Sequence, residues 1–565
     1  MKGKLFILAS AILALSLTAC NTNKPTSDNP SSSEQQSSSS SSSSSEGWEG
    51  KTNEDFELAK VTYTKDGVEK PLNRNTIYTN AGSPHVDGYH IDEAAEIHAM
   101  VVPFGFTDDD LQDRQTAANI ERFKTCFFGT NEEIQAKGGL YSLAGFYQQS
   151  SYGLSNFQGQ VLPAWCLYNG TTAQFASASS GGAGVYAANY ARNWYISEYA
   201  KENHGALGAD AHPLTWFDVN NDGYIDLMWV VYSKDYRSGT DWWAYVTYTG
   251  NPANKTSPNV KTLAWASLRF LDNGYGGYDT HTFIHETGHT FGLDDYYDYT
   301  DSWAPMGGVD YMDHNLGDHS MFSKFSLGWT RPWVVDDDAL ITLRPGTTTG
   351  DCFILPSPGY NGTAFDEYMM VELMAPVGLA EQDYKNGYQN TSGFTQPGIR
   401  ITHVDNRVYA GSHDVPLTTN PEDGLDTRIG NSHMGRSGVK VDGDYWTHED
   451  GKRTSYSQFS IMEANCDQDK NWTLTSTYNA SNASLFQKNG FFNLKPNWGW
   501  AKTFMPSKSN LWNKAKTTTG WTGKDTQAYT IDETCTFNYS LKVISIEKDA
   551  EAGYIAKVQV TANAY

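Results

Sequence analysis

Cysteine is scarce in this 565-residue sequence, and its spacing matches no cysteine-based zinc module. Of six cysteines, Cys20 ends an apolar N-terminal stretch, which leaves five in the rest of the chain. An odd number allows at most two disulfides among those five. A Cys126–Cys166 bridge is conceivable, although the sequence does not establish it.

Basic side chains are also in short supply. Lysine and arginine number 41 against 65 aspartates and glutamates, which gives a formal net charge of −24. Proteins that bind nucleic acid need a basic surface, so this class of partner is excluded. The acidic balance fits a soluble extracellular protein that can bind calcium.

Beyond its N-terminus the sequence lacks any uninterrupted apolar run of about 18 residues, so it predicts no transmembrane helix. Residues 1–20, MKGKLFILASAILALSLTAC, combine two lysines, a short apolar run and small residues, which indicates a secretory signal peptide. The exit Leu17–Cys20 resembles a bacterial lipobox and predicts a lipid on Cys20. A plain secreted precursor with a chance cysteine is the alternative.

The serine tract at 31–50 cannot bury a core, so we assign 21–52 to a disordered linker. A lipid anchor followed by such a linker predicts a folded body held at the bacterial cell surface, facing outward, or shed from it. Residues 53–95 form an N-terminal segment of unknown role. The remaining length exceeds one compact core and predicts two or more domains.

Residues 281–295 read HTFIHETGHTFGLDD and contain an HExxH motif. In a helix His285 and His289 lie one turn apart on one face, so their imidazoles can converge on one ion. Glu286 lies about 100° round the helix from His285, within reach of a water on that ion. Two neutral nitrogens for zinc and a carboxylate that takes a proton from water are the chemistry of this motif. A surface helix with a chance match is the alternative.

A catalytic zinc site needs three protein ligands and one open position. The sequence has no glutamate between Glu286 and Glu367, which disfavours a distant glutamate as the third ligand. Gly292 can end the helix in a left-handed turn, after which the chain can return beneath the histidines. Asp295, ten residues after the first histidine, is therefore the expected third ligand, and its neighbour Asp294 is the competitor.

The other histidines of this region are His281, His314 and His319. We expect them beside the site or on the surface. His281 lies one turn before the first ligand, so a spare ligand role is a weaker alternative.

Strands and helices alternate through residues 96–335, which predicts an α/β or α+β domain. Residues 96–106 and 226–233 read as buried strands, and 184–202 read as a helix. From residue 336 short strands are separated by Gly, Asn, Ser and Asp, so 336–565 is predicted to be predominantly β and sandwich-like.

The segment DVNNDGYID (218–226) has the spacing of a calcium loop. Positions 1, 3, 5 and 9 are filled by Asp218, Asn220, Asp222 and Asp226, and Gly223 provides the turn. Trp229 stands where an EF-hand needs a bidentate glutamate, which excludes an EF-hand. A shorter calcium loop remains, with a metal-free Asx-rich turn as the alternative.

Two methionines follow the metal motif, Met306 in APMGG and Met312 in VDYMDHN. In metzincin-type peptidases a methionine turn forms an apolar floor beneath the metal. We favour Met312, with Met306 next; ordinary core packing is the simpler explanation for either.

Several segments together resemble the immune inhibitor A-like family of bacterial zinc metallopeptidases. They are HETGHTFGLDDYYD (285–298), GDHSMFSKFSLGW (317–329), SLAGFYQQSSYG (142–153), EYMMVEL (367–373) and GIRITHVD (398–405). Where the family usually has proline before the third ligand, this chain has Asp294. The resemblance implies a metzincin-like catalytic domain over 96–335, followed by the β-rich region.

We therefore expect a monomeric, lipid-anchored zinc endopeptidase that acts on proteins or peptides, with Glu286 as general base and calcium as a candidate second ion. One alternative is a glycan- or protein-binding surface lipoprotein with a vestigial metal site, supported by the 34 tyrosines and 17 tryptophans. Another is a metal-capturing lipoprotein. The intact Glu286 argues against both.

Overall fold

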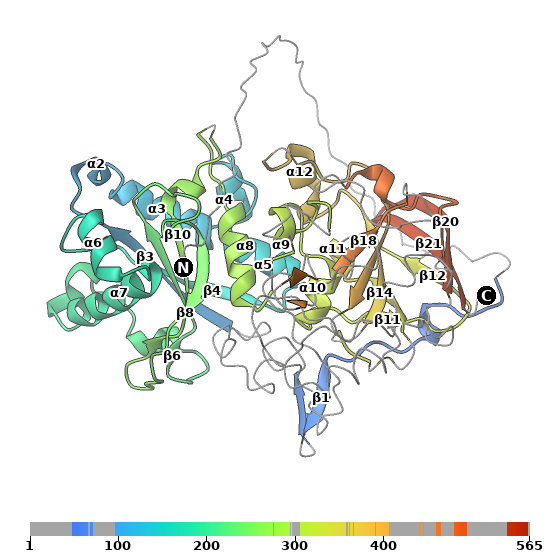
Figure 1. The fold of residues 1–565 in the computed structure, drawn as a ribbon, viewed down its shortest axis with the longest axis horizontal. Coiled ribbons are helices and arrows are strands. Elements are labelled where there is room, and N and C mark those ends of the chain that lie inside the picture. The colour runs from blue at the N-terminus through green and yellow to red at the C-terminus, as the bar shows by residue number, and fades with distance from the viewer. Residues whose placement is uncertain are drawn as a thin grey trace, which may run out of the picture. The chain divides into compact units, whose positions relative to one another are not determined.

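The computed structural model describes most of the chain from Trp48 onward (Figure 1). The described residues are 48–65, 68–71, 96–274, 276–293, 295–296, 306–357, 360, 362–364, 367–389, 391–405, 440–441, 444–445, 459–464, 480–493 and 539–562. Cys20, the signal peptide, nearly all of the serine-rich linker and Asp294 lie outside them. Residues from Glu49 on form one unit by their contacts, and the predicted domain boundary at residue 336 stays a prediction.

The first half of this unit contains a six-stranded sheet. Five of its strands have the order β4-β3-β7-β10-β8, and the sixth, β5, pairs with β3. All its pairings are parallel except that of β8, which runs antiparallel to β10. The central strands β7 and β10 are buried along their whole length, as expected for parallel strands covered on both faces. The six strands are β3 (Glu96–Gly105), β4 (Asn156–Val161), β5 (Cys166–Leu167), β7 (Leu227–Tyr232), β8 (Tyr245–Tyr248) and β10 (Thr262–Ser267).

Alternate side chains of these strands belong to two separate apolar cores. Trp229 of β7 joins the core that holds residues of α3 (Ala117–Phe128), α5 (Leu143–Ser150) and α8 (His281–Thr290). Its neighbour Met228 joins the core beneath α6 (Thr172–Ser179) and α7 (Ala183–Tyr199). The sheet therefore has helices on both faces, and the predicted strands at 96–106 and 226–233 and helix at 184–202 are confirmed.

The conceivable Cys126–Cys166 disulfide is wrong. Both thiols are free and buried. Cys126 on α3 packs into the first core and Cys166 on β5 packs into the second, so the two side chains belong to cores on opposite faces of the sheet.

The second half contains two further sheets, of order β11-β13-β14-β15-β18 and β12-β21-β20-β19. One apolar core holds residues of both, such as Phe353 and Ile401 from the first sheet and Ile341 and Val558 from the second. The strands are β11 (Trp333–Val334), β12 (Ala339–Leu343), β13 (Cys352–Pro356), β14 (Glu367–Met374), β15 (Gly398–Asp405), β18 (Phe459–Met462), β19 (Phe491–Asn493), β20 (Tyr539–Asp549) and β21 (Gly553–Ala562). The chain is thus a mixed α/β protein with several sheets, which confirms the predicted class at that level.

Residues 51–60, which include the predicted end of the linker at residue 52, lie along these late strands. Lys51 bridges to Ala339 and Leu58 bridges to Trp333. Phe56 is buried in the core that the two late sheets share. This gives part of the N-terminal segment a structural role that its sequence did not reveal.

Shorter elements connect these parts. They are β1 (Thr62–Lys65), β2 (Val68–Pro71), α2 (Asp109–Gln112), α4 (Asn131–Gln135), β6 (Tyr224–Ile225), β9 (Asn259–Val260), α9 (Tyr311–His314), α10 (Met321–Ser326), α11 (Gly346–Thr349), α12 (Leu379–Asn386), β16 (Lys440–Val441) and β17 (Asp444–Tyr445). Within the described part of the chain, no helix has the length and apolar character needed to cross a membrane.

Candidate metal centre

The helix α8 carries the HExxH motif and ends as the sequence predicts. Gly292 adopts a left-handed φ of 87°, which a residue with a Cβ would rarely adopt. Its N–H donates to the carbonyl of His289 at 2.9 Å, and the next N–H, of Leu293, donates to Gly288 at 3.2 Å. These two bonds form a Schellman cap, which turns the chain back toward the helix.

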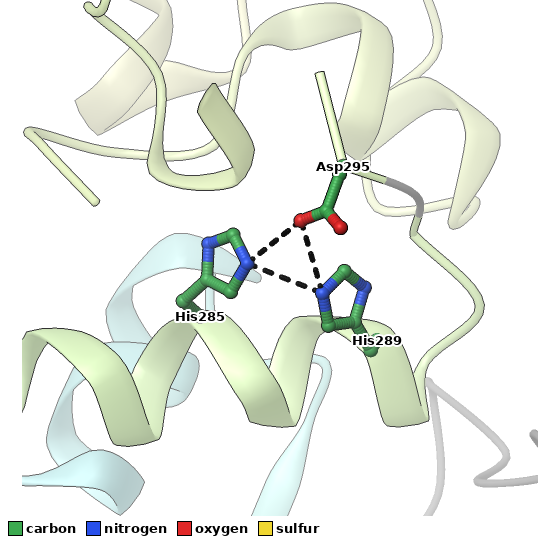
Figure 2. A group of neighbouring side chains, drawn as sticks. All are labelled: His285, His289 and Asp295. Carbon is green, nitrogen blue, oxygen red and sulfur yellow. Dashed lines mark hydrogen bonds and ion pairs between the residues drawn. The ribbon is translucent and has the colours of Figure 1, made fainter. Parts of the chain in front are cut away.

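That turn brings three side chains together (Figure 2). Nε2 of His285 lies 2.9 Å from Oδ1 of Asp295, and Nε2 of His289 lies 3.2 Å from the same oxygen. The two Nε2 atoms are 3.1 Å apart. Among the described residues this is the one group of three or more His, Cys, Asp or Glu residues that could hold a metal ion.

Backbone carbonyls orient both histidines. Nδ1 of His285 lies 2.9 Å from the carbonyl oxygen of Tyr311, and Nδ1 of His289 lies 2.8 Å from that of Leu293. A carbonyl only accepts, so each Nδ1 must carry the hydrogen. In neutral rings each Nε2 is then a bare acceptor that faces the centre of the group.

Three acceptor atoms therefore converge: the two Nε2 atoms and one carboxylate oxygen. Acceptors this close repel one another unless a positive charge lies between them. Ligands at 2.0–2.1 Å from a tetrahedral zinc ion stand about 3.3 Å from one another. The observed separations of 2.9–3.2 Å are close to that value. The donor set and its spacing thus fit zinc.

Protons are the other source of positive charge. Burial lowers the pKa of His289, but the nearby Asp295 charge outweighs burial and raises it to about 10. Burial in turn raises the pKa of Asp295, but the two histidines hold it well below its usual range. A metal ion entering this site would displace a proton from His289.

Glu286 lies between His285 and His289 on α8 and is buried. Burial raises the pKa of its carboxyl group. The charges that modify this shift are those of His289, His285 and Asp295, so the carboxyl group lies beside the ligand set without belonging to it.

Three contacts fix α8 against its surroundings. Nε1 of Trp229, on β7, donates to Thr287 at 3.2 Å. The hydroxyl of Tyr147, on α5, donates to the carbonyl of Ile284 at 2.6 Å. At position 288 an added Cβ would come within 2.6 Å of the Met312 sulfur, so a larger residue there would have to displace the Met312 side chain.

Met312 is thus the methionine whose side chain lies against the metal helix. Its carbonyl also accepts the N–H of Tyr296, the residue after Asp295. Met306 is equally buried, and its N–H donates to Asp313, as does that of Gly308. Both methionines therefore belong to one folded segment, residues 306–314, which we call the methionine loop.

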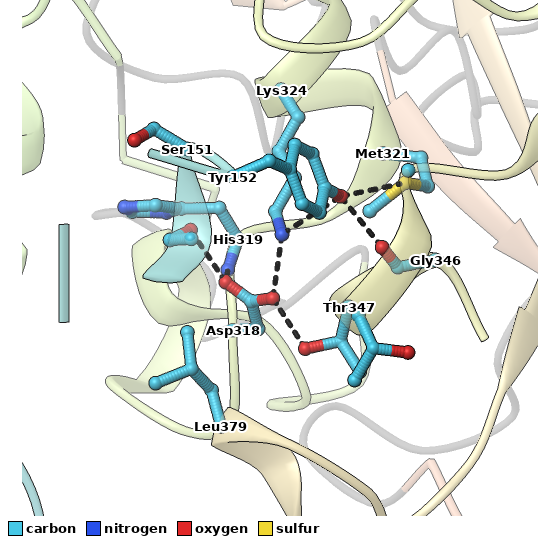
Figure 3. Close-up of polar contacts among 12 residues, drawn as sticks. Ser151, Tyr152, Asp318, His319, Met321, Lys324, Gly346, Thr347 and Leu379 are labelled. Carbon is cyan, nitrogen blue, oxygen red and sulfur yellow. Dashed lines mark hydrogen bonds and ion pairs between the residues drawn. The ribbon is translucent and has the colours of Figure 1, made fainter. Parts of the chain in front are cut away.

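A buried polar network supports the chain after this loop (Figure 3). Lys324 has no exposed surface, and its ammonium group lies 2.6 Å from Asp318 and 3.1 Å from the Tyr152 hydroxyl. Asp318 also accepts hydrogen bonds from Ser150 and Thr347, each at 2.6 Å. The network joins α5, α10 and α11. Sequence reasoning missed it, although a lysine within an apolar helix was a signal for it.

The remaining histidines lie near the site but outside the ligand set. Both ring nitrogens of His281 contact carboxylates, so it is no spare ligand. His319 is buried among aromatic rings, including those of Tyr147 and Tyr311. His314 is half-buried at the end of α9.

The calcium-like loop forms a tight turn, with Gly223 at φ 94°. Asp218 accepts the N–H groups of Asp222 and Gly223, each at 3.0 Å. Asp226 accepts the backbone N–H of His98 at 2.9 Å. Burial raises the pKa of Asp226 to about 7. These hydrogen bonds are those of an Asx-rich turn, and the carboxylates of the loop do not converge as the His285 group does, so calcium stays a prediction.

Neither a scan against protein-family models nor a search of curated proteins found a match to this chain.

The ligand set predicts different outcomes for the two adjacent aspartates. Asp295→Ala removes one of three ligand atoms, so the purified variant should lose most of its zinc on dialysis. Asp294→Ala should keep its zinc, because Asp295 already completes the set. Elemental analysis of both proteins measures this directly. Zinc lost from the Asp294 variant and kept in the Asp295 variant would reverse the assignment.

A second prediction concerns the 218–226 loop. If the loop binds calcium, added calcium should raise the melting temperature of the natural chain through mass action. Asp222→Ala should have a lower melting temperature that does not respond to calcium. A response of equal size in both proteins would show that calcium binds elsewhere.

Proposed function

We propose that this protein is a zinc-dependent endopeptidase of the immune inhibitor A-like type. The convergence of His285, His289 and Asp295, with both imidazoles oriented by backbone carbonyls, is the observation that carries the proposal. The arrangement provides three protein ligands, which is the number that a catalytic zinc site uses.

A zinc ion held there would polarise a substrate carbonyl and lower the pKa of a bound water to about 7. Glu286 would take a proton from the attacking water and return it to the leaving amine. Burial raises the pKa of the Glu286 carboxyl group, which makes its carboxylate a stronger base than an exposed one. This suits the uptake of a proton from the water, and the acid that results can pass the proton to the leaving amine.

The edge of the sheet supports a peptide as the substrate. β8 ends the six-stranded sheet among the described residues, and α8 contacts it. An extended peptide can add to such an edge through main-chain hydrogen bonds. This arrangement favours a protein or peptide over a small solute.

The binding-protein alternative has less support. Most large aromatic side chains in the described residues lie in or against the cores, and the exposed ones are Tyr236, Trp243 and Phe491. The number of tyrosines and tryptophans therefore reflects packing in large part.

The anchor is proposed from the sequence. The lipobox-like exit before Cys20 and the serine-rich linker after it support a lipoprotein tethered to a membrane, with its catalytic body facing outward. The metzincin-like domain followed by a β-rich region belongs to the same proposal.

Glu286→Gln should lower the hydrolysis of casein by about 10²–10⁴-fold, the usual contribution of a general acid–base group. Zinc content should not change, because Glu286 is not a ligand. Glu121→Gln, on the exposed side of α3, is the matched control and should keep full activity. Hydrolysis at the natural rate by the Glu286 variant, or in the presence of a strong zinc chelator, would overturn the proposal.

Cys20→Ser should move the protein from the membrane fraction to the soluble fraction, since the lipid would be attached through the thiol. Its specific activity should not change, because the linker separates the anchor from the body. Fractionation by sedimentation with immunodetection measures the first effect. Unchanged co-sedimentation with membranes would show that another segment is the anchor.

A further inference from the structure

His281 begins the metal helix α8 and contacts two carboxylates. Nδ1 lies 2.7 Å from Oδ1 of Asp279, and Nε2 lies 3.0 Å from Oδ1 of Asp383. Ionised carboxylates only accept hydrogen bonds, so both ring nitrogens must donate. The side chain is therefore an imidazolium ion with both of its hydrogens in use.

These contacts join segments that are distant in sequence. Asp383 lies on α12, and only 1% of its side chain is exposed. Its second oxygen accepts the N–H of Gly317 at 2.5 Å, in the chain that follows α9. Asp279 also accepts the backbone N–H of His281 at 2.9 Å. One cation thus connects the start of α8 with α12 and with the segment after the methionine loop.

The ring of His281 also leads to a metal ligand. It stacks on Tyr388, with ring centroids 4.2 Å apart, and is nearly parallel to Tyr311, at 6.1 Å and 9°. The carbonyl of Tyr311 orients His285. A displacement of α12 would therefore reach His285 through three contacts: Asp383 with His281, His281 with Tyr311, and Tyr311 with His285.

The charges explain why both aspartates are needed. A cation at a helix N-terminus is unfavourable, because the helix dipole places partial positive charge there. Two carboxylates reverse the sign of the local charge. Burial would lower the pKa of His281, but the charges of Asp383 and Asp279 raise it to about 10. Loss of either carboxylate would leave a partly compensated cation in a buried place.

We propose that His281 is a positioning residue for the metal centre, held between Asp279 and Asp383, and that α12 is thereby part of the support of the site. The inference rests on the metal site of the proposed function and does not require that the protein hydrolyse peptides. A chain that binds zinc without peptidase activity would disprove the proposed reaction and leave this inference open to the same test.

The experiment measures zinc affinity in the full chain by competition with a chromogenic chelator. Asp383→Asn should weaken zinc binding by about 10-fold, the lower end of the effect of losing a direct partner of a ligand, because Asp383 acts on His285 through His281 and Tyr311. The visible absorption bands of the cobalt-substituted protein should shift as well, because the orientation of His285 changes. A purely structural role would alter stability without moving these bands.

Asp351→Asn is the matched control. Asp351 is also a buried carboxylate in the second half, but its partner is Arg344 and it has no hydrogen bond to α8. Its zinc affinity and cobalt spectrum should equal those of the natural chain. His281→Gln should reproduce the effect of Asp383→Asn, and the double variant should lose less than the product of the two single losses, since they remove one interaction.

Natural zinc affinity and an unchanged cobalt spectrum in folded Asp383→Asn and His281→Gln would overturn the inference. Circular dichroism of the metal-free proteins establishes folding. If the buried change at 383 prevents folding, Asp279→Asn replaces it, because the Asp279 side chain is 14% exposed and lies at the edge of the same contact. It should weaken zinc binding in the same direction.

Discussion

The candidate metal centre depends on two hydrogen bonds from histidine rings to backbone carbonyls. They place a hydrogen on Nδ1 of His285 and of His289 and leave each Nε2 directed at Asp295. Both carbonyls belong to segments outside α8, that of Leu293 in the return turn and that of Tyr311 in the methionine loop. The geometry of the three side chains therefore depends on how α8, the return turn and the methionine loop pack together. Much of the surrounding structure fixes the relative positions of these segments.

Contacts on two sides fix the relative positions of α8 and the methionine loop. On one side β7 and α5 hold α8 through Trp229 and Tyr147. On the other side the methionine loop is held by the buried Asp310, which accepts the N–H groups of Met312 and Ser320. Arg400 of β15 donates to the carbonyl of Val309, so the second half also reaches this loop. A site that looks local in sequence is thus assembled from both halves of the chain.

The sequence predicted the parts of this arrangement that follow from local rules. Helical spacing placed His285 and His289 on one face, and the conformational freedom of Gly292 predicted the left-handed turn that brings Asp295 to them. Uninterrupted apolar runs predicted the buried strands. The missing parts depend on contacts between distant residues, and no periodicity reports these. Asp383 lies 102 residues from His281, and nothing in its own neighbourhood marks it as a partner.

The conceivable Cys126–Cys166 disulfide was wrong for the same reason, because it too depended on contacts between distant residues. Sequence spacing does not reveal on which face of the sheet the side chains of Cys126 and Cys166 pack. Asp294 lies outside the described residues, so the choice between the two aspartates rests on where Asp295 is placed.

The pairing of residues 51–60 with late strands has a consequence for any maturation of the chain. Phe56 in the shared core contributes about 1.5–3 kcal/mol of burial energy, and the bridges at Lys51 and Leu58 add to it. If a peptide bond between Lys65 and Glu96 were cut, this strip would be held only by those contacts, as a separate peptide in its place in the β structure. A nicked molecule in which they persist would keep its size in a native separation and divide into two chains in denaturant. A lipid tether on the N-terminal strip would then hold the rest of the protein at the membrane through these contacts, without a continuous chain.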